Sequence, residues 1–204
     1  MAEVVERIER SSLLLHMRPV FEVDDEKFEE FCRINRDLRI EMTAEGDLII
    51  MPPTFGRTGN RNFKLTALVY LWSERDGTGV GFDSSTLFVL PNGAKRSPDV
   101  SWVRKSRLAT LSDEQKNKFL PLCPDFVLEL RSASDSLAEL QAKMREYIEN
   151  GAQLGWLLDP STRTIHMYRP DRGVEQLADA ETVAGDPVMP GLVLHLRQIW
   201  EADF

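Results

Sequence analysis

The 204-residue sequence contains few of the residues that build disulfides, zinc sites or histidine-based chemistry. Its two cysteines, Cys32 and Cys123, form no C-x-x-C pair, which predicts free thiols in a reducing compartment. The three histidines (16, 166 and 195) lie far apart and share no metal-ligand spacing. Because no G-x-S-x-G elbow is present, serine hydrolase chemistry has little support.

Long apolar runs are also missing. The run from Leu13 to Leu15 is too short for a signal-peptide core or a membrane span. Glu3 and Glu6 stand where a signal peptide carries positive charge. These features predict a cytoplasmic protein that does not enter a membrane.

Positive charge is scarce as well. The chain has 25 Lys and Arg against 33 Asp and Glu, a net charge of −8, and a pI of about 5.0. This balance argues against a protein that coats nucleic acid non-specifically, although it allows an enzyme with a local basic groove. Hydrophobic residues make up 42% of the chain, enough for the core of one α/β domain. We expect residues 1–23 to be an N-terminal extension and residues 24–204 to form that domain.

Local patterns predict the order of helices and strands. Apolar residues at helical spacing predict helices over 24–37, about 58–74 and 136–151, and Ser112 caps a short helix over 111–119. Residues 38–53 predict a hairpin of two short strands. A strand, a helix and a second strand follow one another over 125–159, which predicts a βαβ unit.

An acid stands inside the apolar strand FVLEL. By period-two alternation, the apolar residues Phe126, Leu128 and Leu130 point one way, while Glu129 and Arg131 point the other. A buried carboxylate is costly unless a cation or hydrogen-bond donors compensate it. Two interpretations follow.

In the first interpretation, Arg131 neutralises Glu129 as a structural ion pair. In the second, Glu129 converges with Asp99, at the start of the strand DVSWV, on a hard divalent cation such as Mg²⁺. Lys143 lies at the edge of the apolar stripe of the helix over 136–151, so packing on the strand brings it towards this site. Two acids and a lysine suit metal-assisted hydrolysis, whereas a snorkelling lysine is the plainer alternative.

A basic stripe begins the helix over about 58–74. Arg57, Arg61 and Lys64 follow one another at spacings of four and three residues. Such a stripe can hold phosphates, and it is equally consistent with a solvated helix face.

The segments SPDVSWV and FVLELRSASDSLAELQAKMREYIENGAQLGWLLDP together resemble the Uma-two family of endonucleases, within the restriction-endonuclease-like PD-(D/E)XK superfamily. The pieces GDLIIMPP, TGNRN and VGFDSST also fit, so the resemblance extends from about residue 35 to 195. It implies a restriction-endonuclease-like α/β fold, in which one domain has a central mixed sheet flanked by helices. It also implies frequent homodimerisation.

The resemblance assigns roles to individual residues. Asp99 matches the Asp of the PD motif and Glu129 the acid of the (D/E)XK motif, so both would be metal ligands, with the backbone carbonyl of Leu130 as a third. The superfamily's lysine is expected two residues after the acid, where this chain has Arg131. Lys143 matches a lysine that the family usually carries and is the candidate for a migrated catalytic lysine. Arg131 can bind phosphate, but an arginine hardly ever gives up its proton to act as a base.

Three hypotheses follow for the function. The first is a Mg²⁺-dependent DNA endonuclease, with Mn²⁺ as a possible substitute, that hydrolyses phosphodiester bonds at Asp99, Glu129 and Lys143. Its phosphate contacts would be three arginines, Arg57, Arg61 and Arg131. The second is a catalytically inactive protein of the same fold that acts as a nucleic-acid-binding or protein-interaction dimer; the acidic pI and Arg131 favour it. The third is an unrelated enzyme with a buried Glu129–Arg131 pair.

Overall fold

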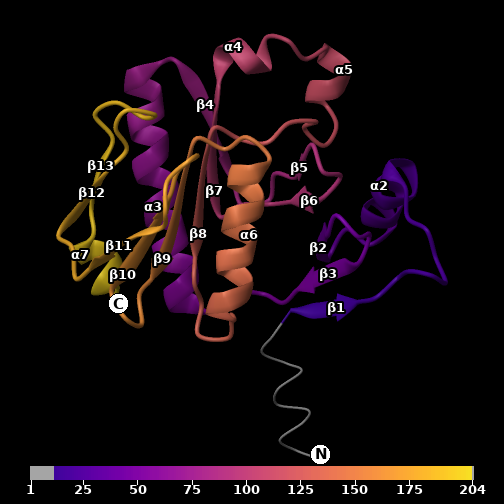
Figure 1. Ribbon diagram of the computed structural model, residues 1–204, viewed down its shortest axis with the longest axis horizontal. Helices are drawn as coiled ribbons and strands as arrows, with labels where there is room; N and C mark the ends of the chain where they lie inside the picture. The colour runs from indigo at the N-terminus through magenta and orange to yellow at the C-terminus, as the bar shows by residue number, and fades with distance from the viewer. Residues whose placement is uncertain (1–11, 204) are drawn as a thin grey trace, which may run out of the picture.

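The computed structural model describes residues 12–203, and its main body is a six-stranded mixed sheet (Figure 1). The strand order is β11-β10-β9-β8-β7-β4, in which β8 and β9 are parallel and every other pair is antiparallel. The bounds are β4 Gly79–Asp83, β7 Val100–Arg104, β8 Phe126–Leu130, β9 Leu154–Asp159, β10 Thr164–Tyr168 and β11 Glu175–Ala178. This is the mixed sheet that the sequence predicts.

A smaller sheet of order β1-β3-β2-β6-β5 lies beside the main body (Figure 1). Its strands are β1 Leu13–Leu15, β2 Arg39–Met42, β3 Leu48–Met51, β5 Phe88–Val89 and β6 Lys95–Arg96. Strands β2 and β3 pair as the predicted hairpin. Strand β1 pairs with β3, so part of the expected extension 1–23 contributes a strand to this sheet. Residues 1–11 of that extension lie outside the described residues.

Four helices, α2, α3, α5 and α6, agree with the sequence prediction to within a few residues at each end, whereas the short helices α4 and α7 were not predicted. The bounds are α2 Asp25–Ile34, α3 Gly56–Asp76, α4 Lys105–Leu108, α5 Asp113–Lys116, α6 Leu137–Glu149 and α7 Arg197–Trp200. Ser112 begins α5 with a reciprocal capping box, and the Ser136 hydroxyl accepts the Glu139 amide at the start of α6. Within residues 12–203, no helix combines the length and the apolar character needed to cross a bilayer.

Helices α3 and α6 pack on opposite faces of the main sheet, which makes a three-layered arrangement (Figure 1). Phe126, Leu128 and Leu130 of β8 belong to the core that includes residues of α3, whereas Val127 belongs to the core that includes Met144 of α6. The predicted alternation of β8 is therefore confirmed, and so is the β8–α6–β9 crossover. A two-stranded sheet of β12 Thr182–Ala184 and β13 Val193–His195 adds residues to the α3-side core.

Candidate active site

Asp99 and Glu129 come together where strands β7 and β8 meet. Val100 pairs with Leu128 in the antiparallel register, so the residue before Val100 faces the residue after Leu128. The backbone N–H of Leu130 donates a hydrogen bond to Asp99 Oδ2 at 2.8 Å. Since the N–H and C=O of a strand residue point to the same edge, the Leu130 carbonyl also faces Asp99. The two acids and this carbonyl thus lie together.

Helix α6 brings Lys143 and Tyr147 onto Glu129. The Lys143 ammonium lies 2.9 Å from Glu129 Oε1, and the Tyr147 hydroxyl donates to the same oxygen at 3.1 Å. The two residues are four apart, so they project from the same side of the helix. Glu129 itself is only 4% exposed, and the Lys143 side chain 13% exposed. Lys143 is therefore at the carboxylate site.

Glu41 of β2 is a further acid at the site, it is buried, and the sequence analysis did not single it out. Its Oε1 accepts hydrogen bonds from Lys143 Nζ and from the Ser97 amide, both at 2.9 Å. Its Oε2 lies 3.3 Å from Arg96 Nη1, and Arg96 also bonds Glu146 at 2.6 Å. The signal was present in the sequence: Glu41 stands between apolar residues of a short strand, as Glu129 does.

Asn62 of α3 is a second residue that the sequence analysis did not single out within TGNRN. Its amide nitrogen donates to Asp99 Oδ1 at 3.2 Å. Its amide oxygen is buried and has no donor among residues 12–203. Helix α3 thus presents to the site one buried oxygen acceptor that still has capacity for a ligand.

Burial and mutual repulsion shift the ionisation of the acids. Burial raises the pKa of Glu129 to about 7; Lys143 opposes the shift, while the charges of Asp99 and Glu41 add to it. Burial also raises the pKa of Asp99, against the opposing effects of the Leu130 N–H and Lys143. These shifts are typical of carboxylates that share one site without enough cations.

Lys143 and Glu41 show the opposite behaviour. Burial disfavours the charge of Lys143, but the carboxylates of Glu129 and Glu41 outweigh it and raise the lysine pKa above its usual value. Burial likewise disfavours the charge of Glu41, but Lys143 and Arg96 outweigh it and lower the pKa of this acid. The two carboxylates thus favour the charged form of Lys143.

Arg131 does not pair with Glu129. Its Nη1 lies 2.6 Å from Asp159 Oδ2, and its Nε donates to the Asp135 carbonyl at 3.2 Å. The structural ion pair with Glu129, and with it the third hypothesis, is wrong. The physical reason is that β8 ends at Leu130, so strict alternation no longer directs the next side chain. The cation beside Glu129 is Lys143.

The basic stripe of α3 contacts the C-terminal segment. Arg57 pairs with Asp203 at 3.1 Å, Arg61 donates to the Ile199 carbonyl at 2.7 Å, and Lys64 donates to the Gln198 carbonyl at 3.4 Å. The structure thus gives Arg57 and Arg61 structural partners and does not bring them together with the two acids. Asn62 is the residue of this stretch that reaches Asp99.

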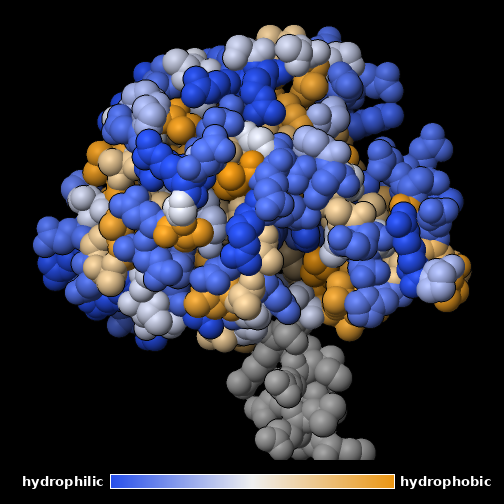
Figure 2. Space-filling view, in the orientation of Figure 1, coloured by the Kyte–Doolittle hydropathy of each residue, from blue (hydrophilic) through white to orange (hydrophobic). Residues whose placement is uncertain are grey.

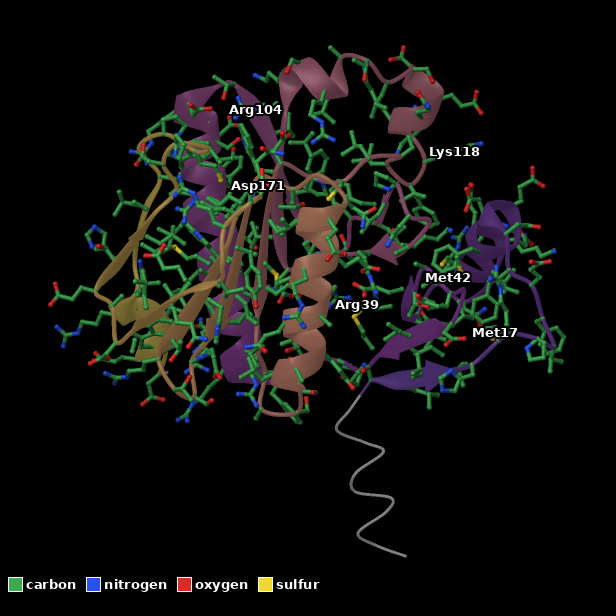
Figure 3. All side chains as sticks on the ribbon, viewed as in Figure 1. Met17, Arg39, Met42, Arg104, Lys118 and Asp171 are labelled. Atoms are coloured by element: carbon green, nitrogen blue, oxygen red, sulfur yellow. The ribbon has the colours of Figure 1, made fainter. Side chains whose placement is uncertain are left out.

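Arg39, at the start of β2, supplies an exposed positive charge near the site. Its Nη2 donates to the Ser84 carbonyl at 2.7 Å, and its charge works against the raised pKa of Asp99. Figure 3 shows it where the small sheet faces α6. The molecular face seen in Figure 2 is mostly hydrophilic, with apolar residues in small groups. Because its side chain is exposed, Arg39 is accessible to a charged ligand.

Two surface hollows are not lined by Asp99, Glu129 or Glu41. One of about 310 Å³ has Glu29 and Lys118 in its wall, and another of about 370 Å³ lies between α3 and β4, with Val69 and Phe82 in its wall. The site is instead marked by its converging charged groups.

The residues present fit a hard divalent cation. Four carboxyl groups outnumber the two cations of this network; the six residues are Glu41, Asp99, Glu129, Glu146, Lys143 and Arg96. Within residues 12–203, no three His, Cys, Asp or Glu side chains are arranged to enclose a metal by themselves. Magnesium takes one or two carboxylates and keeps several waters, so Asp99, Glu129 and the free Asn62 oxygen suit it.

A comparison with solved structures agrees with the fold described above. The chain has a restriction-endonuclease-like fold: it is similar to the crystal structure of a "putative nuclease belonging to DUF820" from Anabaena variabilis, with a TM-score of 0.68 and 19% identity. The similarity covers 79% of this chain and 89% of that one. No curated protein matches the sequence.

The family follows from the sequence itself. The model of the Uma2 family, described as "Putative restriction endonuclease", matches residues 25–197. The chain belongs to this family, as the resemblance noted in the sequence indicates.

Proposed function

We propose that this protein is a Mg²⁺-dependent DNA endonuclease with its active site at Asp99, Glu129 and Lys143. Membership of a family described by restriction endonuclease activity supports the reaction class. The observation that carries the proposal is the convergence of the buried carboxylate of Glu129 and the part-buried carboxylate of Asp99, from neighbouring strands, with a lysine that is only 2.9 Å from Glu129. Such a set needs a cation to complete it, and phosphodiester hydrolysis is the chemistry that it suits.

Asp99 and Glu129 would hold the metal, with the Leu130 carbonyl as a third ligand. Bound there, Mg²⁺ would polarise the scissile phosphate and neutralise part of its charge. Hydrolysis joins the oxygen of a water to phosphorus and breaks the bond to the departing sugar oxygen; the water loses a proton to solvent, and the departing oxygen takes up a proton from solvent. Lys143 would stabilise the negative charge that develops on the phosphate oxygens. Asn62 orients Asp99 through its amide N–H.

Substrate binding needs cations near these groups. We propose Arg39 as a phosphate contact, because its guanidinium is exposed, uses one N–H on Ser84 and retains others for a ligand. Arg131 is engaged with Asp159, and Arg57 and Arg61 with the C-terminal segment, so these arginines have less capacity for phosphate.

Incubation of the purified protein with supercoiled and linear DNA, with Mg²⁺, Mn²⁺ or EDTA, tests the proposal. Wild-type protein should cut with either metal and not with EDTA. Glu129→Ala and Asp99→Asn should abolish cutting while circular dichroism shows a retained fold. Cutting that persists in Glu129→Ala protein would exclude this site.

The alternative function is an inactive nuclease-fold dimer that binds nucleic acid or protein. Arg131 in place of the expected lysine favours it. It predicts no Mg²⁺ or Mn²⁺ isotherm by calorimetry, whereas the nuclease predicts one that Asp99→Asn removes. Homodimerisation is a separate prediction, which light scattering on the purified protein tests.

A further inference from the structure

Strand β2 of the small sheet contributes a residue to the site on the main sheet. Ile40 and Met42 of this strand pack in the core of the small sheet with Phe28. By period-two alternation Glu41 points to the opposite side, and there it reaches α6. It is only 2% exposed, so its charge is fully enclosed between the two sheets.

Both oxygens of Glu41 are engaged. Oε1 accepts from Lys143 Nζ and from the Ser97 amide, each at 2.9 Å, and Oε2 faces Arg96 at 3.3 Å. Ser97 and Arg96 hold the carboxylate from the β6 side, so it presents one oxygen to the lysine in a fixed position. An isolated lysine side chain has four rotatable bonds and would otherwise sample many positions.

Lys143 thus has two carboxylate partners that differ in the other groups they would contact. Glu129 would share its charge with the metal and also accepts the Tyr147 hydroxyl. Glu41 would not share its charge with the metal, because its other contacts are with two donors of the protein, Arg96 and the Ser97 amide. The contact that remains fully available to hold the ammonium group in the loaded site is therefore the one with Glu41.

We propose that Glu41 is a positioning residue that holds the Lys143 ammonium in place for catalysis. The inference rests on the proposed nuclease function. It also assigns the small sheet a role in the reaction, since its strand β2 then sets the geometry of a group on α6. Glu41 acts through Lys143 and touches neither substrate nor metal.

Glu41→Gln tests this role, because glutamine keeps the size of the side chain and removes its charge. We expect kcat for DNA cleavage to fall about 100-fold, the usual consequence of a misplaced catalytic group. The KM for DNA and the Mg²⁺ affinity measured by calorimetry should change little. Glu149→Gln is the control for the loss of one carboxylate, since Glu149 is exposed at the end of α6 and lies outside this network, and it should cut like wild type.

A stability cycle tests the contact without relying on cleavage. Urea unfolding of wild type, Glu41→Gln, Lys143→Met and the double variant should give strongly non-additive effects, as expected for residues in contact. Additive effects would overturn the contact and the inference with it. If Glu41→Gln does not fold, Glu41→Asp, which keeps the charge and shortens its reach, should show the same fall in kcat.

The outcomes separate the two proposals. Wild-type protein that fails to cut DNA with Mg²⁺ or Mn²⁺ overturns the nuclease function, and the role of Glu41 falls with it. Wild-type protein that cuts, together with a folded Glu41→Gln or Glu41→Asp variant of unchanged kcat, overturns the role of Glu41 alone.

Discussion

Replacing Glu129 with glutamine should make the metal-free protein more stable relative to wild type as the pH rises. Burial raises the pKa of Glu129 to about 7 from its usual 4.5. A carboxyl whose folded-state pKa is raised contributes stability that is complete below pH 4.5 and is lost as the pH rises through 7. The shift corresponds to about 3 kcal/mol. Glutamine has no such proton, so the variant does not lose this stability.

Urea unfolding in EDTA at pH 5 and pH 8 measures the effect. The quantity compared is the free energy of unfolding of Glu129→Gln minus that of wild type. This quantity should be about 2 to 3 kcal/mol larger at pH 8 than at pH 5. Glu149→Gln, at the exposed end of α6, controls for the change in net charge. Equal differences at the two pH values would refute the buried, cation-poor environment assigned to Glu129. Mg²⁺ at pH 8 should stabilise wild type and leave Glu129→Gln unaffected, because ligand binding to the folded state adds stability.

Three further substitutions test separate parts of the structure. Lys143→Met leaves Glu129 and Glu41 buried without their shared cation, and urea unfolding should show a loss of about 3 to 5 kcal/mol. Arg39→Ala should weaken DNA binding in low salt and reduce the slope of log K against log salt by about one, with an unchanged unfolding midpoint. Arg131→Ala should cost about 2 kcal/mol, since it leaves a buried acid unpaired while the arginine is itself partly exposed. Calorimetry should show that Arg131→Ala keeps the Mg²⁺ affinity of wild type; a lost isotherm would place Arg131 in the metal site.

The parts of the fold that local patterns encode could be predicted from the sequence. The βαβ unit, the alternation of β8 and the position of Lys143 at the edge of the α6 stripe all follow from periodicities of two and 3.6 residues. These periodicities determine which face of an element meets the sheet. They therefore indicated that Glu129 and Lys143 could approach each other.

The partners of individual charges could not be predicted in the same way. Arg61 lies 138 positions from the Ile199 carbonyl that it contacts, and no spacing within α3 reveals that acceptor. The alternation of β8 predicted that Arg131 lies on the same face as Glu129, but β8 ends at Leu130, one residue earlier. Glu41 carried a usable signal, an acid within an apolar strand, but its partner Lys143 lies 102 positions away on another element.

The hydrogen bond from the Leu130 amide to Asp99 provides a spectroscopic probe of the site. An amide that donates to a carboxylate senses the charge of that carboxylate, because the bond is stronger to the ionised form. The ¹⁵N and ¹H resonances of Leu130 should therefore move when Asp99 changes protonation or binds a cation. One labelled leucine amide would then report on occupancy of the site in solution, with no substrate present.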